Sequence, residues 1–505
     1  MTIGRTQTVS LQGLLGSVID IECDIADGIP MYSLLGLPDT SLQESRDRVR
    51  AALTNTGQRW PNKKVTVSLS PAWLPKSGPG FDCAIALALL IADGTLPQGP
   101  LEGFVILGEL SLDGAIRPVR GVLPSLIAAL QQGITRAIVP RANAQEALLL
   151  EQMEILSFGH LFEIYRWLLT GEFPVADELA IEVETRENDL DFSDVAGQVR
   201  SRFAAEVAAA GGHHLLLIGP PGAGKTMIAS RIPTILPPLN EAQALEVTAI
   251  HSIAGGLNQR SVMSRMAPIV SPHHSASRAS IVGGGNRSIL PGAISLAHRG
   301  VLFIDEAPEC AMGTLDALRQ PLESGTITIS RQVGSVTFPA EFLLVLAANP
   351  CPCGKFTGKG LACTCTSLQV RRYLGKLSGP LMDRIDIRVQ VDPVGRVELT
   401  APDLGESSVA IRERVIAART RAALRFNNYP WQLNSQIPAR ALRGDFSPER
   451  AGSNFLHEEL DRERITARGL HKVIRLSWTL ADLAEHQRPT LADVKQAFLL
   501  REGGE

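Results

Sequence analysis

The feature that most constrains the fold of this chain is a glycine-rich stretch at residues 219–226, which reads Gly-Pro-Pro-Gly-Ala-Gly-Lys-Thr. It fits G-x-x-x-x-G-K-[ST], the pattern of a phosphate-binding loop. An apolar run at 215–218 precedes it and a helix-compatible run at 227–231 follows it. Glycines let consecutive backbone N–H groups curl around phosphate oxygens, and the dipole of the following helix adds positive potential. The stretch therefore predicts a nucleotide-binding α/β core.

The side chains of this loop predict how a nucleotide is held. Lys225 should reach the β- and γ-phosphates, and Thr226 should ligate Mg²⁺. Upstream, residues 191–198 resemble the segment that wraps the adenine in AAA+ ATPases. The residues expected to contact ATP are Gly219, Pro220, Pro221, Gly222, Ala223, Gly224, Lys225, Thr226, Val195 and Gly197.

Two more apolar runs end in polar side chains. Residues 300–304 are typical of a buried strand and are followed by Asp305 and Glu306, and residues 342–348 are followed by Asn349. Because the carboxyl ends of parallel strands face one crevice, these side chains should lie beside the loop. Asp305 is predicted to hold Mg²⁺, Glu306 to polarise the attacking water, and Asn349 to contact the γ-phosphate. An asparagine there is otherwise a common turn residue.

Composition limits the remaining possibilities. The chain has 505 residues, 45% hydrophobic and 20% charged, which is typical of a globular protein of several domains. Its net charge of −3 excludes a global basic field, so any nucleic-acid contact must be local. Residues 1–10 hold no apolar signal core, and the longest apolar run, 83–92, predicts a buried helix because it is too short to span a bilayer. We expect a cytoplasmic protein without a membrane partner.

The first block, residues 1–170, is predicted to be a mixed α/β domain, with strands at 18–22, 65–69 and 105–107 and helices at 42–54 and 124–132. Segments 74–82 and 107–121 resemble the Lon-type protease domain, which implies a ribosomal S5 domain 2-like fold. In that family a serine and a lysine carry the reaction, but Gly80 and Leu123 stand at the aligned positions here. The resemblance thus implies the fold without the protease. A dyad of Ser77 with Lys76 is the alternative.

Four of the seven cysteines cluster in a C-x-C…C-x-C pattern. Thiolates on two short Gly/Pro-rich turns suit tetrahedral zinc, so a structural zinc site is favoured over four reduced thiols. The ligands would be Cys351, Cys353, Cys363 and Cys365. A metal pair at His273 and His274 is disfavoured, because adjacent side chains on regular elements point apart.

Several arginines are candidates for contacts with other molecules. Residues 322–338 predict a β-hairpin with Arg331 near its tip, and residues 283–292, which include Arg287, form a second inserted loop. The pair is either surface decoration or the lining of a ring pore that grips nucleic acid. Arg384 is read as an exposed arginine at a subunit edge or as a salt-bridged surface residue. The arginines of a helix at 408–426 predict a solvated face rather than a nucleic-acid patch.

Taken together, the segments 219–226, 294–306, 318–323, 349–354 and 379–386 resemble the magnesium-chelatase-like AAA+ ATPases of the ComM/YifB family, as does the first block. The resemblance implies an α/β multidomain chain: a Lon-like domain at 1–170, a linker at 171–191, an AAA+ core with inserted β-hairpins at 192–392, a zinc loop at 351–365 and a helical lid at 393–505. One departure is the segment 267–271, which is less arginine-rich than in family members.

The same resemblance implies a function. It implies an ATP-hydrolysing homo-hexamer that uses Mg²⁺ and acts on single-stranded or branched DNA as a helicase or branch-migration translocase, in natural transformation or recombination. Arg384 would act as a finger from the neighbouring subunit, and Arg468 would be the second sensor of the lid. The alternatives are a magnesium-chelatase-type remodelling ATPase that serves a protein or metal-insertion partner, and an ATP-dependent protease.

Overall fold

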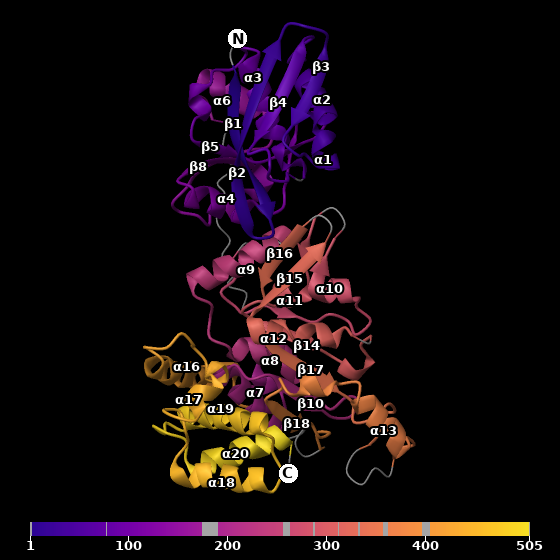
Figure 1. The fold of residues 1–505 in the computed structure, drawn as a ribbon, viewed down its shortest axis with the longest axis vertical. Coiled ribbons are helices and arrows are strands. Elements are labelled where there is room, and N and C mark those ends of the chain that lie inside the picture. Colours follow the sequence, from indigo (N-terminus) through magenta and orange to yellow (C-terminus); the bar gives the residue numbers. More distant parts are fainter. Residues whose placement is uncertain are drawn as a thin grey trace.

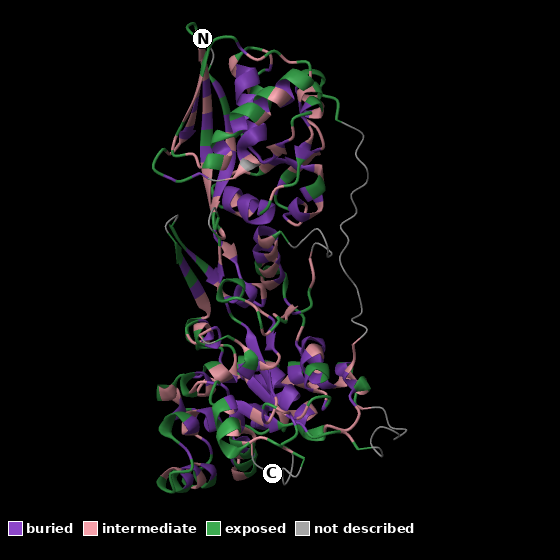
Figure 2. Cartoon of the chain, turned by 90° about the vertical axis from the view of Figure 1, so that its right-hand side faces the viewer, coloured by how far each residue is buried: buried purple, intermediate pink, exposed green. Residues whose placement is uncertain are grey.

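A computed structural model of the chain describes residues 3–76, 78–173, 190–255, 263–285, 288–311, 313–331, 334–356, 362–395 and 405–503. Two sheets organise it, one toward each end of an elongated molecule, and the two termini lie at opposite ends (Figure 1). Buried residues are concentrated around these two sheets, while the region between them is thinner and more exposed (Figure 2). Most of the predicted linker, residues 174–189, falls outside the described residues.

The N-terminal unit is built on a seven-stranded mixed sheet of order β3-β4-β2-β1-β5-β8-β9. Its strands are β1 (Gly4–Gln12), β2 (Leu15–Ala26), β3 (Met31–Leu35), β4 (Lys64–Ser70), β5 (Phe104–Ile106), β8 (Arg136–Pro140) and β9 (Glu154–Phe158), with a small pair β6 (Glu109–Leu110) and β7 (Ile116–Arg117) beside them. The strands predicted at 18–22 and 65–69 lie within β2 and β4, and the strand predicted at 105–107 overlaps β5, which ends at Ile106.

One helix forms the centre of this unit. α3 (Asp82–Ala92) buries ten of its eleven residues against β1 and β2, because its sequence is apolar on every face. This confirms the buried helix predicted from the longest apolar run. The other helices are α1 (Thr40–Gln43), α2 (Ser45–Asn55), α4 (Val122–Gln131), α5 (Ala144–Ala147) and α6 (Leu161–Thr170), so the helix predicted for 42–54 is divided at Glu44.

The second unit contains a five-stranded sheet in which every paired neighbour is parallel, with the order β11-β14-β17-β10-β18. Its strands are β10 (Leu215–Ile218), β11 (Ile269–Val270), β14 (Val301–Ile304), β17 (Leu343–Ala348) and β18 (Ile387–Gln390). All residues of β14 and β17 are buried, as expected for strands covered on both faces. The register pairs Ile218 with Ala348, so the loop after β10 and the residue after β17 leave the same edge.

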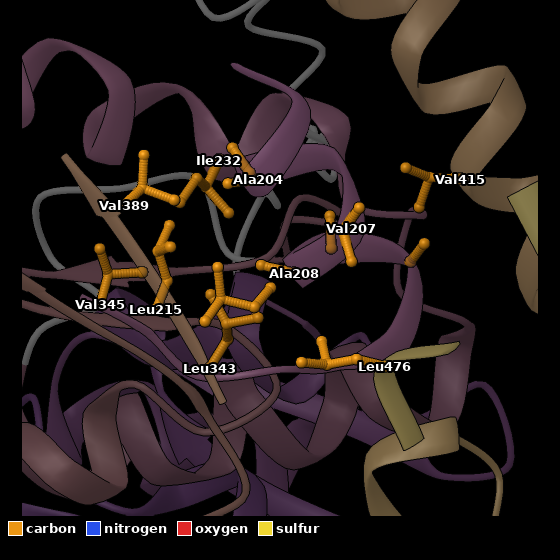
Figure 3. Close-up of a cluster of buried hydrophobic side chains, with 14 of the residues drawn as sticks. Ala204, Val207, Ala208, Leu215, Ile232, Leu343, Val345, Val389, Val415 and Leu476 are labelled. Carbon is orange, nitrogen blue, oxygen red and sulfur yellow. The ribbon is translucent and has the colours of Figure 1, made fainter. Parts of the chain in front are cut away.

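Helices cover this sheet and extend it. α7 (Val199–Gly211) and α8 (Lys225–Ile235) pack on one face with the C-terminal helices α16 (Ser408–Arg425) and α19 (Ala467–Leu483). Figure 3 shows Val207, Leu215, Val415 and Leu476 from four of these elements in one apolar cluster. The remaining C-terminal helices are α13 (Ser367–Leu374), α14 (Gly379–Met382), α17 (Ala439–Leu442), α18 (Arg450–Asp461) and α20 (Leu491–Glu502), the last capped by Thr490 as predicted.

The prediction that the arginines of α16 form a solvated face is wrong. Arg414 pairs with Glu206 of α7, Arg419 donates to the Ala209 carbonyl, and Arg425 pairs with Asp482 of α19. These three guanidinium groups fasten α16 to α7 and α19, because the helix lies between two partners that offer carboxylates and a carbonyl.

A set of small elements lies between the two sheets. α9 (Glu241–Ala254), α10 (Arg278–Val282), β12 (Gly283–Gly284), β13 (Leu290–Pro291), α11 (Ala293–Leu296) and α12 (Pro321–Ser324) surround the hairpin of β15 (Thr326–Arg331) and β16 (Gly334–Pro339). Gly283, at φ 101°, lets β12 approach the hairpin: a Cβ there would lie 2.7 Å from Ile329 Cδ1.

These central elements also join the two units. Leu245 and Ala249 of α9 pack into the apolar cluster that includes α4, and the Ser252 hydroxyl donates to the buried Glu146 carboxylate. The Gly121 N–H donates to the Ser252 carbonyl at 3.3 Å. The N-terminal unit therefore rests on a helix of the second unit through both apolar and polar contacts. No helix within the described ranges is long and apolar enough to cross a bilayer.

Candidate nucleotide site

Lys225 lies at the centre of the candidate site. It is the first residue of α8 and is largely buried, and its Nζ donates to the carbonyls of Gly219 at 2.6 Å and Pro220 at 2.9 Å and to Asn349 Oδ1 at 3.1 Å. Three acceptors satisfy the three donors of an ammonium group. Burial lowers the pKa of Lys225, and the charges of Asp305 and Glu306 oppose that shift. The side chain is thus held at the mouth of the loop.

The loop itself has the backbone that a phosphate cradle needs. Gly222 and Gly224 have φ values of 77° and 94°, and a Cβ added at either would meet open space within 4 Å. Space alone would therefore allow a side chain, but the left-handed backbone favours glycine. Gly224 stands immediately before α8, so the helix N-terminus opens onto the loop.

Asp305, the residue after β14, brings a carboxylate to this loop. Thr226 Oγ1 donates to Asp305 Oδ2 at 2.7 Å, and the Glu306 N–H donates to Asp305 Oδ1 at 2.8 Å. Glu306 has a left-handed backbone, with φ 48°, and its side chain is half-exposed. A hydroxyl and a carboxylate in contact form an oxygen donor set that suits Mg²⁺. Thr226 and Asp305 are the residues that would hold this ion.

Asn349 and the segment before α7 complete the surroundings of the loop. Asn349 follows β17 and contacts Lys225, and its backbone N–H faces the phenol oxygen of the buried Tyr373 of α13. Burial raises the pKa of Tyr373 to about 12. On the other side, Gln198 Nε2 donates to the Ala223 carbonyl at 3.1 Å. This bond brings the segment that includes Val195 and Gly197 against the loop.

Arg384 and Arg468 lie together at a cavity apart from the loop. Arg384 is paired with Glu323 and donates to the Pro380 carbonyl at 2.6 Å, while Arg468 Nη1 lies 3.3 Å from Asp383 Oδ2. Both line a cavity of about 780 Å³ whose described lining includes no residue of the loop 219–226. In this single chain the Arg384 side chain is 19% exposed and salt-bridged to Glu323; its role at a subunit edge stays a prediction.

The four clustered cysteines converge. Their Sγ atoms lie within 4.8 Å of one another, with Cys351 at 3.3 Å from Cys353 and 3.6 Å from Cys363. Zinc with Zn–S bonds of about 2.3 Å would place tetrahedral sulfurs about 3.8 Å apart, so the donor set fits this metal. The four thiols are close enough to share protons, and a metal would have to displace those that remain.

Other predicted positions are placed as follows. Arg331 is exposed at the end of β15, whereas Arg287 and the hairpin residues 332–333 lie outside the described residues. In the N-terminal unit Leu123 is buried in the core and Gly80 faces the Val119 side chain. Ser77 is outside the described residues, so a dyad with Lys76 is not described. Lys76 is itself buried and donates to the Pro71 carbonyl.

Sequence reasoning did not predict the contacts of Tyr373, Gln198 and His274. Gln198 ends the segment 191–198 and His274 belongs to the histidine pair considered for a metal, but neither pattern shows what the side chain touches, and no motif includes Tyr373. The adjacent histidines are also a correction. Their rings lie side by side, tilted by 35° with centroids 4.1 Å apart, rather than pointing apart, because residues 271–277 form no regular element. His274 Nδ1 lies 3.0 Å from Glu306 Oε2.

A parallel sheet with a phosphate-binding loop after one strand and an Asp-Glu pair after another places the second unit among the P-loop α/β proteins. Comparison with protein families narrows this class. Residues 191–399 match the model "Magnesium chelatase, subunit ChlI", residues 21–143 match "Subunit ChlI of Mg-chelatase", and residues 405–501 match "Magnesium chelatase, subunit ChlI C-terminal".

Several known proteins are similar to this chain over nearly its full length. An uncharacterized protein of Mycobacterium tuberculosis is 46% identical over 504 residues, covering 100% of this chain and 99% of its own. The uncharacterized protein YifB of Escherichia coli is 39% identical, covering 99% and 97%. The competence protein ComM of Haemophilus influenzae is 38% identical, covering 98% and 97%. The chain belongs to the magnesium-chelatase-like ComM/YifB family of AAA+ ATPases, which implies ATP and Mg²⁺ as cofactors.

Proposed function

We propose that this chain is an ATP-driven motor that assembles as a homo-hexameric ring and moves single-stranded or branched DNA, as a helicase or branch-migration translocase in natural transformation or recombination. Its place of action would be the cytoplasm. The proposal depends on the separation of two groups of predicted site residues. Lys225, Thr226 and Asp305 meet at one edge of the sheet, while Arg384 and Arg468 line a different cavity.

This separation supports a site shared between subunits. Phosphoryl transfer needs positive charge on both sides of the transferring group. One side is supplied by Lys225 in the loop, but the described cavity that holds both arginines does not include the loop of its own chain. In a ring of head-to-tail contacts, the arginine face of one copy meets the loop face of the next. Arg384 and Arg468 would then act on the neighbour's nucleotide.

Within the site, each residue has a proposed task. The loop backbone and Lys225 bind the phosphates, Asn349 positions the γ-phosphate, and Glu306 takes a proton from the attacking water. Mg²⁺, held by Thr226 and Asp305, would neutralise charge on the phosphates. A zinc ion on the four cysteines would fasten the loop at 351–365, and with it Tyr373, behind Asn349.

DNA is the proposed polymer because of the inserted hairpin and the relative named for competence. β15 and β16 project from the ATPase unit, and Arg331 is exposed near the hairpin end. A net charge of −3 leaves local contacts of this kind as the means of holding a polyanion. Binding through Arg331 and its equivalents in a ring should weaken steeply with salt.

The test combines turnover and assembly. The full chain is assayed for ATP hydrolysis alone, with single-stranded DNA and with forked DNA, and its mass in solution is measured with and without ATP. We expect stimulation by DNA and a six-subunit particle with ATP. Lys225→Ala should abolish turnover, and Glu306→Gln should retain bound ATP without hydrolysing it. Undiminished turnover in either variant would contradict the site, and a monomer with every nucleotide would contradict the ring.

A second candidate is a remodelling ATPase that acts on a protein or metal-insertion partner. It is favoured by the descriptions of the matched family models, which name a magnesium-chelatase subunit. It predicts ATP turnover that depends on Lys225 but is indifferent to DNA of either form. A protease is disfavoured by Gly80 and Leu123, and incubation with casein would reveal one.

A further inference from the structure

We propose that Lys355, Phe356 and helix α13 form a second surface that binds DNA, apart from the inserted hairpin, and we call these residues the basic arm. The inference rests on the proposed function, because it takes DNA as the polymer. It starts from an uneven distribution of charge. Residues 342–382 contain five basic and no acidic side chains, in a chain whose net charge is −3. A block of one sign is typical of a surface that binds a polyanion.

The basic side chains of this block are exposed and have few counter-ions. Lys355, Arg371 and Arg372 are all exposed. Of the carboxylates that the structure describes, only Glu309 pairs with a member of the block, at 3.6 Å from Lys376 Nζ. An ordinary solvated surface mixes charges of both signs. The basic arm therefore keeps positive charge that nothing in the described chain neutralises.

The fold gathers these charges at the edge of the molecule. α13 lies at the margin of the ATPase unit (Figure 1), and Tyr373 is its one buried residue. Cys353 Sγ lies 3.6 Å from Cys363 Sγ, so the turn that leads to Lys355 is held beside the segment that enters α13. Because α13 has eight residues and is about 12 Å long, its arginines stay close to that turn. Both elements can then contact phosphates of one strand.

An aromatic side chain adds a preference for unpaired bases. Phe356 follows Lys355 directly, and it is 46% exposed. An exposed ring among basic side chains suits the stacking of bases in single-stranded DNA. A duplex keeps its base faces covered by its own stacking, so the ring contributes little to duplex binding. The basic arm should therefore hold single strands more tightly than duplex.

The basic arm is also joined to the nucleotide site at two points. A Cβ at Gly354, the residue before Lys355, would lie 2.5 Å from Pro221 Cδ, so this turn rests on the phosphate-binding loop. The phenol of Tyr373 faces the backbone N–H of Asn349. DNA bound to the basic arm therefore acts on elements that hold the phosphates, which provides a route by which DNA changes ATP turnover.

The experiment measures how the full chain, with a non-hydrolysable ATP analogue, binds a fluorescent single-stranded oligonucleotide and its duplex at several salt concentrations. Arg371→Gln combined with Arg372→Gln should weaken binding of both forms roughly tenfold or more at low salt. It should also lower the salt slope for single strands by about 1.4, since each lost phosphate contact removes about 0.7. Phe356→Leu should weaken single-strand binding roughly fivefold or more and leave duplex binding within about twofold.

A matched control changes two arginines that are exposed but have a counter-ion. Arg462 and Arg464 both contact the Glu459 carboxylate, at 2.9 Å and 3.1 Å. Arg462→Gln combined with Arg464→Gln should leave the affinity and the salt slope unchanged. The mass of every variant with ATP is measured in the same samples, so that a loss of assembly is not mistaken for a loss of DNA contacts.

The outcomes separate this inference from the proposed function. If the natural chain binds neither form of DNA, the proposed function fails and the basic arm fails with it. If the natural chain binds DNA but the Arg371 and Arg372 variant keeps its affinity and salt slope, only the second surface is wrong. Loss of the six-subunit particle in that variant would make α13 a contact between copies and overturn the inference. Equal weakening of single-strand and duplex binding by Phe356→Leu would refute the stacking.

Discussion

The proposed ring predicts that two inactive variants restore each other. Arg384 is held by Glu323 and the Pro380 carbonyl, in a cavity whose described lining excludes the loop around Lys225. Lys225→Ala and Arg384→Ala should each be inactive alone, the second by on the order of 10³–10⁵ in rate. Lys225 follows the end of β10 whereas Arg384 precedes the start of the parallel strand β18, so the two defects lie at opposite edges of the sheet. A copy with Arg384→Ala still offers an intact loop to a neighbour that has lost only Lys225.

The size of the recovery follows from counting interfaces. In a ring mixed at random from equal amounts, half the interfaces have an intact loop and half of those meet an intact arginine, so about one quarter of the sites are complete. We expect about one quarter of the natural turnover per subunit if sites act independently, and less if they are coupled. The assay mixes the variants at low nucleotide concentration, allows exchange and then follows phosphate release.

A matched mixture provides the control. Lys225→Ala and Glu306→Gln both damage the loop side of an interface, so no interface in that mixture is complete and no recovery is expected. Recovery in the first mixture only would support the shared site. An absence of recovery in both, with subunit exchange verified by labelled copies, would refute it. So would substantial turnover by Arg384→Ala alone.

The zinc site and a buried ion pair give two further predictions. Metal analysis should find about one zinc per chain, lost in Cys353→Ser and kept in the control Cys310→Ser, whose thiol lies outside the cluster. Burial alone would raise the pKa of Asp386, but the Lys472 ammonium 2.6 Å away helps hold that pKa well below its usual range. The ionised Asp386 therefore stabilises the folded state above about pH 4, and this stabilisation is lost as pH falls through the folded-state pKa. Lys472→Met should cost about 3–5 kcal/mol at neutral pH and move the acid loss to higher pH, as measured by urea unfolding across pH; a midpoint that does not change would contradict it.

Strands and helices could be predicted from the sequence where the local pattern of apolar residues matches the burial of the element. β10, β14 and β17 are apolar throughout because parallel strands are covered on both faces, and each ends where a motif residue begins. The family resemblance depended on the same segments. α3 was equally predictable, since a helix that is apolar on all sides has only a core in which to lie.

The alternation of apolar and polar residues does not predict β1. Its inward positions are occupied by Thr6, Thr8 and Ser10, which are buried although polar. Thr6 Oγ1 donates to the Ala84 carbonyl of α3 at 2.9 Å, so a hydroxyl satisfies a helix carbonyl where the pattern would require an apolar side chain. A period-2 pattern of apolar residues cannot detect such a strand, because the inward face is defined by its partners.

The partners of polar side chains could not be predicted from the sequence either. Whether the arginines of α16 face solvent depends on the carboxylates that α7 and α19 bring beside them, and those contacts join residues about 200 and about 60 positions apart. The contact between His274 and Glu306 is of the same kind. It becomes visible only when the strand order places β11 next to β14, because β17 or β10 in that position would have separated the two residues.

The contacts of the central elements constrain how the N-terminal unit takes part in any motion. Gly13, in the turn between β1 and β2, has φ 63°, and a Cβ there would lie 2.2 Å from Val336 Cγ1 of β16. The turn thus touches the inserted hairpin, while α4 rests on α9 of the ATPase unit. A hairpin that moves with hydrolysis must either carry the N-terminal unit with it or break this contact. Because the α4–α9 contact is larger and buries Glu146 with Ser252, the turn is where separation would begin.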